Sequence, residues 1–272
     1  MSGDILLSAK DLSVRFGGVL AVNKVSFDVR RGEVFTLIGP NGAGKTTVFN
    51  LISRIYTPTT GQITWHGEER GPIALTQQAP HAIAALGIAR TFQNIELFEH
   101  ATVLHNLLIG RHTHRQTGFW SEVFFTPTTR RAEIEAREKA EQVIELLDLQ
   151  HHRDSMVAGL PYGVRKVVEL ARALCTEPKL LLLDEPSSGL NVEETADMAF
   201  WIQDIQHELG VSVLMVEHDM SLVSKVSDRV LAMNMGEVLA TGSPGEVQAD
   251  ARVVEAYLGT VDDVSSLRRV AA

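Results

Sequence analysis

The stretch Gly39-Pro-Asn-Gly-Ala-Gly-Lys45-Thr46-Thr47 fits the pattern G-x-x-x-x-G-K-[ST]. Residues 33–38 before it are typical of a buried strand, and apolar residues recur at helical spacing through 48–55 after it. The glycines allow the backbone to wrap around a phosphate group and turn successive N–H groups toward it. The following helix adds the positive end of its dipole. Together these features predict a phosphate-binding loop; the competing interpretation is an ordinary glycine-rich turn before a helix.

In such a loop each residue has a definite task. The ammonium group of Lys45 is expected to reach the β- and γ-phosphates of a nucleoside triphosphate, and the Thr46 hydroxyl is expected to bind Mg²⁺. The loop residues expected to contact the nucleotide are Gly39, Asn41, Gly42, Ala43, Gly44, Lys45, Thr46 and Thr47.

Two later apolar runs end in polar residues that suit the same chemistry. The run 180–183 is followed by Asp184 and Glu185. At the carboxyl end of a parallel strand, Asp184 can hold Mg²⁺ and Glu185 can polarise an attacking water. The run 211–216 leads to His218, which can donate a hydrogen bond to a γ-phosphate. The competing interpretations are a solvated acidic turn and a histidine at a strand end without a special role.

Composition limits the class of protein. The chain has 272 residues, of which 44% are hydrophobic and 22% charged, and a net charge of −9. That charge argues against nucleic acid as a partner. No apolar run approaches the length of a membrane span, and the first residues lack a secretion signal, so the cytoplasm is the expected location. The single Cys175 lies in an apolar-periodic segment and is expected to be a buried, inert thiol.

The distribution of apolar residues predicts an α/β protein with a helical insertion. Alternation over 7–29 indicates antiparallel strands, and apolar runs after Gly159 are typical of parallel strands covered on both faces. The other predicted elements are strand 62–65, helices 80–86, 102–108, 130–149 and 243–258, and a hairpin over 229–239. An aromatic cluster in 112–128 is either a small satellite core or a docking site.

The motifs together resemble the nucleotide-binding subunit of an ABC transporter over residues 5–258. Phe16 matches the aromatic residue that stacks on adenine. Gln93, in Arg90-Thr-Phe-Gln, matches the Q-loop glutamine, which touches Mg²⁺ and couples to the membrane subunit. The segment 188–191, Ser-Gly-Leu-Asn, matches the D-loop, and His218 matches the switch histidine. The ordered set is far more specific than any single member.

The family's signature, close to Leu-Ser-Gly-Gly-Gln, corresponds to Leu160-Pro-Tyr-Gly-Val164. The resemblance implies that Leu160, Tyr162 and Gly163 meet the nucleotide bound by a partner subunit. The serine hydroxyl is absent because position 161 is Pro, and Val164 replaces the glutamine. The helix dipole and the Gly163 N–H remain. The strength of ATP hydrolysis and the pairing of two copies are both left open by this departure.

The resemblance implies a P-loop NTPase core with a mainly parallel sheet, an N-terminal antiparallel β subdomain and an inserted α-helical subdomain. One ATP-binding domain is expected over 5–258, with core segments 5–93 and 159–258, a helical subdomain over about 94–158 and a tail at 259–272. The implied substrate and metal are ATP and Mg²⁺. The implied partners are a second ATP-binding subunit, identical or different, two membrane permease subunits and, indirectly, a solute-binding protein. This would place the chain at the cytoplasmic face of the plasma membrane.

Further sequence features resemble those of the ATP-binding subunits of branched-chain amino acid importers. These features are Gly87–Asn94, the helical insertion, the signature tyrosine, Glu217-His-Asp-Met220 and the ending 254–259. Importers of urea and short amides share these features, and an exporter ATPase is a further alternative. A GTPase would need an Asn/Thr-Lys-x-Asp element, which is not found. ABC ATPases of DNA repair or translation usually carry coiled-coil arms or two cassettes, and this chain has one cassette and no heptad run.

Overall fold

The computed structural model describes residues 4–67, 71–91, 95–111 and 127–258. An antiparallel sheet of four strands has the order β2-β1-β4-β5. Its strands are β1 (Ile5–Phe16), β2 (Val19–Arg30), β4 (Thr60–Trp65) and β5 (Ile73–Ala74). The predicted antiparallel region is therefore confirmed.

The second sheet has six strands in the order β10-β9-β3-β8-β7-β6. They are β3 (Val34–Ile38), β6 (Ile88–Arg90), β7 (Leu180–Asp184), β8 (Ser212–Val216), β9 (Arg229–Asn234) and β10 (Glu237–Gly242). All neighbours pair in parallel except β9 and β10, which form the predicted hairpin. Strand β3 pairs with β8, so the phosphate loop that follows β3 lies beside the end of β8 at Val216. The expected mainly parallel core is confirmed.

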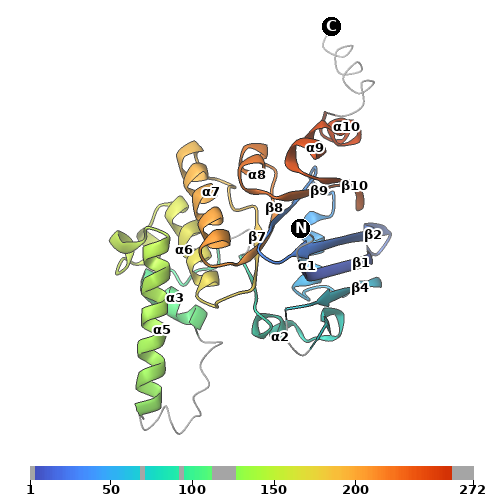
Figure 1. Ribbon diagram of the computed structural model, residues 1–272. Helices are drawn as coiled ribbons and strands as arrows, with labels where there is room; N and C mark the ends of the chain where they lie inside the picture. Colours follow the sequence, from blue (N-terminus) through green and yellow to red (C-terminus); the bar gives the residue numbers. More distant parts are fainter. Residues whose placement is uncertain (1–3, 68–70, 92–94, 112–126, 259–272) are drawn as a thin grey trace.

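The helices lie on both faces of the large sheet. They are α1 (Lys45–Ile52), α2 (Pro80–Ala85), α3 (Val103–Gly110), α5 (Pro127–Leu146), α6 (Tyr162–Leu174), α7 (Val192–His207), α8 (Met220–Val226), α9 (Pro244–Ala249) and α10 (Ala251–Leu258), with 3₁₀ turns η1 (Leu75–Gln77), η3 (Gln150–His152) and η4 (Val157–Gly159). Helices α3, α5, α6 and α7 gather on one side of the large sheet, and the antiparallel sheet lies on the other (Figure 1). Among the described residues, no helix is both long and apolar enough to span a membrane.

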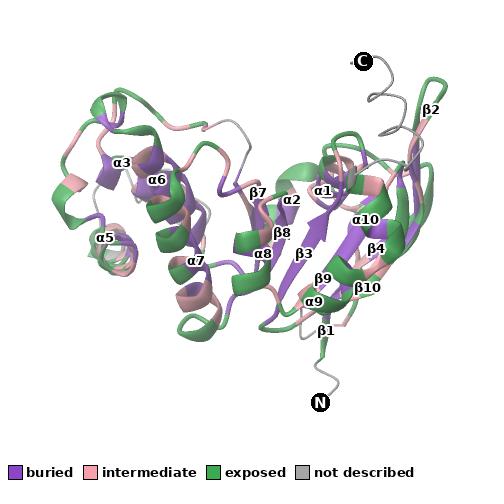
Figure 2. Cartoon of the chain, turned by 90° about the horizontal axis from the view of Figure 1, so that it is seen from above, coloured by how far each residue is buried: buried purple, intermediate pink, exposed green. Residues whose placement is uncertain are grey.

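Alternate residues of the parallel strands enter two different cores, which is why these strands are apolar throughout. Leu180 and Leu182 of β7 pack with α1 and the antiparallel sheet. Leu181 and Leu183 pack with α3, α5, α6 and α7. Figure 2 shows the resulting burial of the central strands between the two halves of the molecule. The sheet therefore holds its strand ends rigidly, and these ends carry the candidate site.

Two predicted helices differ from those observed. The helix expected over 130–149 is α5, which begins at Pro127 and ends at Leu146. Its apolar periodicity predicts Ile134 on the buried side, but Ile134 is 48% exposed. The helix expected from Ser243 to Leu258 is interrupted at Asp250, whose backbone is extended (φ −67°, ψ 123°). The Asp250 carboxylate accepts the N–H of Arg252 (2.9 Å), so it serves as a cap for a second helix. The aromatic cluster in 112–128 lies almost entirely outside the described residues, and the tail at 259–272 lies wholly outside them.

Candidate functional site

The phosphate loop connects β3 to α1, as the sequence predicted. Gly39, Gly42 and Gly44 all have positive φ (148°, 82° and 100°), a conformation that favours glycine. Side chains at two of these positions would also have no room. A Cβ atom at Gly39 would collide with the carbonyl oxygen of Met233, and one at Gly44 with that of Ala21. The glycines are thus required by both backbone geometry and close packing.

Lys45 is buried within this loop and is turned back onto it. Its Nζ donates hydrogen bonds to the carbonyl oxygens of Gly39 (2.7 Å) and Pro40 (3.2 Å). Burial lowers the pKa of Lys45, and the charges of Glu185 and then Asp184 oppose this change. The two carboxylates at the end of β7 therefore act electrostatically on the loop's lysine. The ammonium group is positioned to exchange carbonyl oxygens for phosphate oxygens.

Asp184 is held by an ion pair that was not expected from the sequence. Its Oδ2 lies 2.8 Å from the guanidinium of Arg90, the last residue of β6. Arg90 also donates hydrogen bonds to Asn50 Oδ1 (2.8 Å) and Ser53 Oγ (3.1 Å) at the end of α1. The other carboxylate oxygen of Asp184 is buried and has no hydrogen-bond partner among the described residues. A buried, unpartnered carboxylate oxygen suits a hard cation such as Mg²⁺, so this residue fits the expected metal.

Glu185 follows Asp184 in a left-handed backbone conformation, with φ of 51°. This conformation is uncommon for a residue with a side chain. The Glu185 N–H donates to the Val216 carbonyl (2.9 Å), and the Glu185 carbonyl accepts the N–H of Ser188 (3.1 Å). The turn separates the directions of the two acidic side chains: Asp184 is buried against Arg90, whereas Glu185 lines the cavity of the phosphate loop.

Glu217, at the end of β8, is completely buried and joins two loops. Its carboxylate accepts N–H groups from Ser187 (2.8 Å), His218 (2.8 Å) and Asp219 (3.1 Å). His218 itself is exposed, with its side chain 56% accessible and Nδ1 3.8 Å from the Glu217 carboxylate. The backbone of the predicted histidine is therefore held by a neighbouring carboxylate that sequence reasoning did not single out.

These elements enclose a cavity of about 650 Å³. It is lined by Val19, Leu20, Ala21, Asn41, Gly42, Ala43, Gly44, Lys45, Thr46, Thr47, Glu185 and Met235. The β9–β10 hairpin closes one side, because the Gly236 N–H donates to the Ala43 carbonyl (3.0 Å). Thr46 and Thr47 are thus brought together with Glu185, as the sequence predicted, whereas Met235 and residues 19–21 were missed.

The signature region lies apart from this cavity, at the beginning of α6. Pro161 caps the helix without a side-chain hydrogen bond, and the Tyr162 ring packs against Gly189 of the predicted D-loop. The Glu194 carboxylate, from the first turn of α7, occupies the space beside Gly163. A hollow of about 310 Å³ adjoins Gly163 and Val164. The predicted signature residues therefore lie at the beginning of α6 and do not line the cavity of the phosphate loop.

The remaining predicted residues do not line the cavity of the phosphate loop or lie outside the described residues. Phe16 ends β1 with its ring edge-on to Tyr56, at 4.9 Å between centroids, and does not line the cavity of the phosphate loop. Leu160 is buried just before the signature helix. Gln93 lies outside the described residues.

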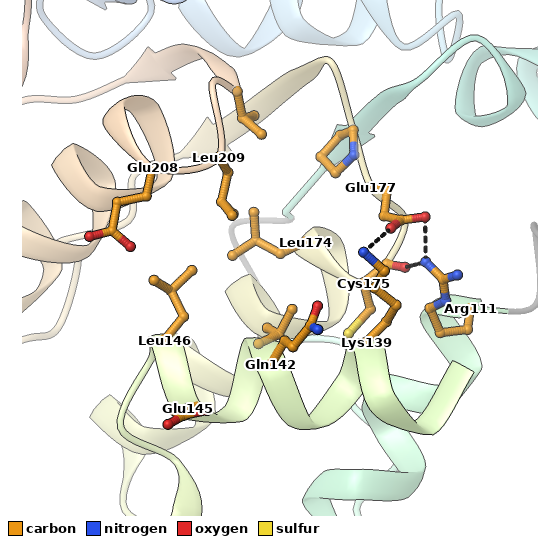
Figure 3. A pocket seen from close by; sticks show the side chains of 13 residues that line it. Arg111, Lys139, Gln142, Glu145, Leu146, Leu174, Cys175, Glu177, Glu208 and Leu209 are labelled. Atoms are coloured by element: carbon orange, nitrogen blue, oxygen red, sulfur yellow. Dashed lines mark hydrogen bonds and ion pairs between the residues drawn. The ribbon is translucent and has the colours of Figure 1, made fainter. Parts of the chain in front are cut away.

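Two other hollows lie away from the phosphate loop. One, of about 550 Å³, lies between α5, the end of α6 and the segment before β8 (Figure 3). Its leucines face one another, and Glu177 bridges Arg111 (2.8 Å) and Lys139 (3.2 Å) at one end. The second is a mostly apolar groove of about 370 Å³ between α2 and β6 on one side and α3 and α6 on the other.

Comparison with known proteins agrees with this geometry. The family model described as ABC transporter matches residues 22–188, and that described as branched-chain amino acid ATP-binding cassette transporter matches residues 237–263. The chain is 43% identical to the high-affinity branched-chain amino acid transport ATP-binding protein LivG of Salmonella typhimurium, over 93% of this chain and 98% of that protein. It is also 43% identical to the corresponding protein BraF of Pseudomonas aeruginosa, with the same coverage.

A solved structure gives the same result in three dimensions. A nucleotide-free ATP-binding cassette from an ABC transporter superposes with a TM-score of 0.79 at 30% identity, covering 94% of this chain and 100% of the other. A cassette crystallised in its ADP conformation gives the same TM-score and identity. The chain belongs to the ABC transporter family of ATP-binding cassettes, in the branch that contains the branched-chain amino acid transport ATP-binding proteins.

Proposed function

We propose that this chain is the ATP-hydrolysing subunit of an importer for branched-chain or other hydrophobic amino acids. The observation that carries the proposal is the meeting of the phosphate loop and Glu185 around one cavity, with the charges of Asp184 and Glu185 acting on Lys45. The names of the relatives support the amino acid cargo over urea, amides or an exported solute. We further propose one ATP-binding domain over 5–258, with 94–158 as its helical subdomain.

The proposed chemistry combines positioning with charge neutralisation. N–H groups of residues 41–47 would surround the phosphates, and Lys45 would exchange its bonds to Gly39 and Pro40 for bonds to phosphate. Thr46 and Asp184, together with Gln93, would hold Mg²⁺, which when bound supplies positive charge on the phosphate oxygens. Phe16 is proposed to contact the adenine.

Glu185 is proposed to orient and polarise the attacking water, since this residue lines the cavity next to the phosphate loop. His218 is proposed to hydrogen-bond the γ-phosphate. Its exposed imidazole leaves it accessible to a ligand, while the hydrogen bonds of Glu217 fix its backbone. The two proposed functional residues, Glu185 and His218, would thus follow the neighbouring strands β7 and β8.

We propose a dimer with a second ATP-binding subunit, identical or different. Leu160, Tyr162 and Gly163 lie at the beginning of α6, where N–H groups and the helix dipole favour a phosphate. Each nucleotide would contact the phosphate loop of one subunit and the signature helix of the other. Closure of the dimer would then follow ATP binding, and hydrolysis would reopen it.

We propose that the groove of about 370 Å³ receives a segment of a membrane permease. It lies between α2 and β6, next to the phosphate loop's helix, and α3 and α6 of the helical side. Apolar side chains of Ile55 (51% exposed) and Ile109 (44% exposed) stand at its edges. The proposed partners are two permeases in the membrane and a solute-binding protein on the opposite side of it. This arrangement would place the chain at the cytoplasmic face of the plasma membrane as a peripheral subunit.

Replacement of the proposed base tests the function. Glu185→Gln is expected to retain ATP binding and to lower turnover by about 100-fold or more, because an amide cannot polarise the water. Lys45→Ala is expected to weaken ATP binding itself. Binding is measured by calorimetry with ATP and magnesium, and turnover by phosphate release. Near-normal turnover of Glu185→Gln would remove Glu185 from this role. The proposed solute is tested by comparing the uptake of radiolabelled leucine with that of radiolabelled urea.

A further inference from the structure

A buried lysine lies between the signature helix and the proposed base. Lys166, on α6, is only 5% exposed, although lysine side chains seldom are buried unless paired. Its Nζ donates a hydrogen bond of 2.9 Å to the main-chain carbonyl oxygen of Glu185. None of the roles proposed above uses this contact. A buried ammonium group that binds the backbone of a catalytic residue calls for a functional explanation.

The carbonyl that Lys166 binds belongs to an unusual backbone turn. Glu185 has the left-handed φ of 51°, and such a conformation persists only where surrounding contacts determine it. The hydrogen bonds that hold the backbone of Glu185 include Glu185 N–H to Val216, Ser188 N–H to Glu185, and Lys166 to Glu185. The first two are main-chain bonds of the core itself. Lys166 adds a side-chain bond, and it comes from the helical side of the molecule.

Negative charge around Lys166 explains how the ammonium group is tolerated there. Burial lowers the pKa of Lys166, and the charges of Glu169, Glu217, Glu185 and Asp184 oppose the change. The same two carboxylates of β7 act on Lys45 of the phosphate loop. One end of β7 is therefore placed between two buried lysines, one from the phosphate loop and one from the signature helix.

Lys166 also lies one helical turn after Tyr162, the residue at which α6 begins. A helix turn is rigid, so a displacement of the signature end of α6 moves the Lys166 ammonium group with it. The proposed nucleotide of the partner subunit and the chain's own Glu185 are thus connected by a single turn of helix and one hydrogen bond.

We propose that Lys166 is a positioning residue for ATP hydrolysis: it fixes the left-handed turn at Glu185 and links the orientation of that carboxylate to the signature helix. This inference rests on the proposed role of Glu185 as the residue that polarises water. It distinguishes Lys166 from a purely structural lysine, because a structural lysine would affect folding without selectively affecting the hydrolysis step.

Three variants separate the two roles. Lys166→Met keeps the length and apolar stem but removes the donor, and Lys166→Arg keeps donors on a long side chain. The matched control is Lys179→Met, because the Lys179 Nζ also donates to a main-chain carbonyl, that of Gly67 (2.8 Å), at the opposite end of β7. All are made in the full-length chain, assembled with its membrane subunits, and ATP turnover, KM and the unfolding midpoint are measured.

Lys166→Met is expected to lower kcat by about 10- to 100-fold, since misplacing a catalytic group by about 1 Å has effects of this size. KM for ATP is expected to stay within about twofold, because the phosphate loop is intact. Lys166→Arg should recover part of the loss, and Lys179→Met should keep normal turnover. A folded Lys166→Met with normal kcat would overturn the proposal, as would an equal loss in Lys179→Met. If Lys166→Met does not fold, Lys166→Gln takes its place with the same expectations, because the glutamine side chain is one bond shorter than that of lysine.

A double variant shows whether Lys166 acts through Glu185. In a Glu185→Gln background, Lys166→Met is expected to cause little further loss of turnover, since the group that it positions is already inactive. If the loss of turnover in the double variant equals the product of the two single losses, the proposal is overturned. If Glu185→Gln alone keeps normal turnover, the proposed function of Glu185 fails, and the role of Lys166 fails with it. A slow Glu185→Gln beside a normal Lys166→Met would reject only the positioning role.

Discussion

The guanidinium of Arg90 and the carboxylate of Asp184 lie 2.8 Å apart at the carboxyl ends of two neighbouring strands. Both side chains are almost completely buried, at 9% and 1% exposure. Arg90 also binds the end of α1, so the pair connects the phosphate loop's helix to the proposed metal ligand. This contact orients one carboxylate oxygen toward Arg90 and leaves the other available.

Removal of Arg90 is expected to destabilise the protein strongly. Arg90→Met leaves the buried Asp184 carboxylate without its ion-pair partner, a change that costs about 3–5 kcal/mol of unfolding free energy. Denaturant unfolding measures the loss. Arg90→Met combined with Asp184→Asn should regain part of it, because the unpaired charge is gone. The control is Arg54→Met, which removes a more exposed arginine bonded to the Gln78 carbonyl and should cost less than about 1 kcal/mol. Equal losses for Arg90→Met and Arg54→Met would contradict this account.

Restoration of the signature residues is expected to increase both stability and turnover. Pro161 supplies no side-chain cap to α6, whereas Ser at this position would accept an N–H of the first turn and stabilise the helix by about 1 kcal/mol. Pro161→Ser with Val164→Gln also supplies the polar groups that the signature lacks. Unfolding and ATP turnover are compared with Pro161→Ala with Val164→Ala. An unchanged rate in the restored variant would mean that backbone donors suffice.

The thiol of Cys175 is expected to resist alkylation in the native protein. Cys175 is 1% exposed, and burial raises its pKa to about 12, with Arg111 opposing the change. At pH 8 only about one thiol in ten thousand is then ionised, and the thiolate is the reactive form. Mass spectrometry after iodoacetamide treatment should show no adduct until a denaturant is added, and Cys175→Ala gives the background. Rapid labelling without denaturant would refute the burial of this residue.

The Glu177 ion pairs should make a pH-dependent contribution to stability. Burial raises the pKa of Glu177, but hydrogen bonds from Arg111 and Lys139 outweigh it, so the folded-state pKa lies below the ordinary 4.5. A lowered pKa stabilises the fold above pH 4.5, and this stabilisation is lost as the pH falls through the folded-state value. Glu177→Gln should therefore lose up to about 1 kcal/mol at neutral pH, since the carboxylate is 42% exposed, and the difference should vanish in acid. Unfolding of both proteins across pH tests this, and a difference independent of pH would contradict it.

Local patterns predicted the parts of this molecule that depend on local physics. The glycine loop requires positive φ at positions that only glycine favours, and the apolar runs of β7 and β8 are buried on both faces. Such features are visible in sequence because each residue type reports its own backbone or environment. The predicted boundaries of α5 were wrong by about three residues at each end. The interruption at Asp250 was missed, because side-chain capping by Asp250 competes there with helix periodicity.

The charged residues beneath the site could not be predicted in the same way. Three charged residues are buried, or nearly so, and each is paired with a residue that is not its neighbour in the sequence. Arg90 binds Asp184, Lys166 binds Glu185, and Glu217 binds Ser187. Sequence offers one hint, because Lys166 and Glu169 stand among the apolar residues of α6, and a charge on a buried helix face needs a partner. The identity of that partner depends on the topology of the sheet, which short motifs do not encode.

The carboxylate of Glu217 gives the two loops that follow β7 and β8 a common anchor. Ser187 and segment 218–219 share this acceptor through three N–H groups, so a shift in either loop affects the other. Loss of the proposed phosphate contact at His218 would therefore also disturb the segment that begins at Ser187, which is part of the proposed interface with a second subunit. Substitutions in one loop are also constrained by the other, and the two segments are expected to vary together across related proteins.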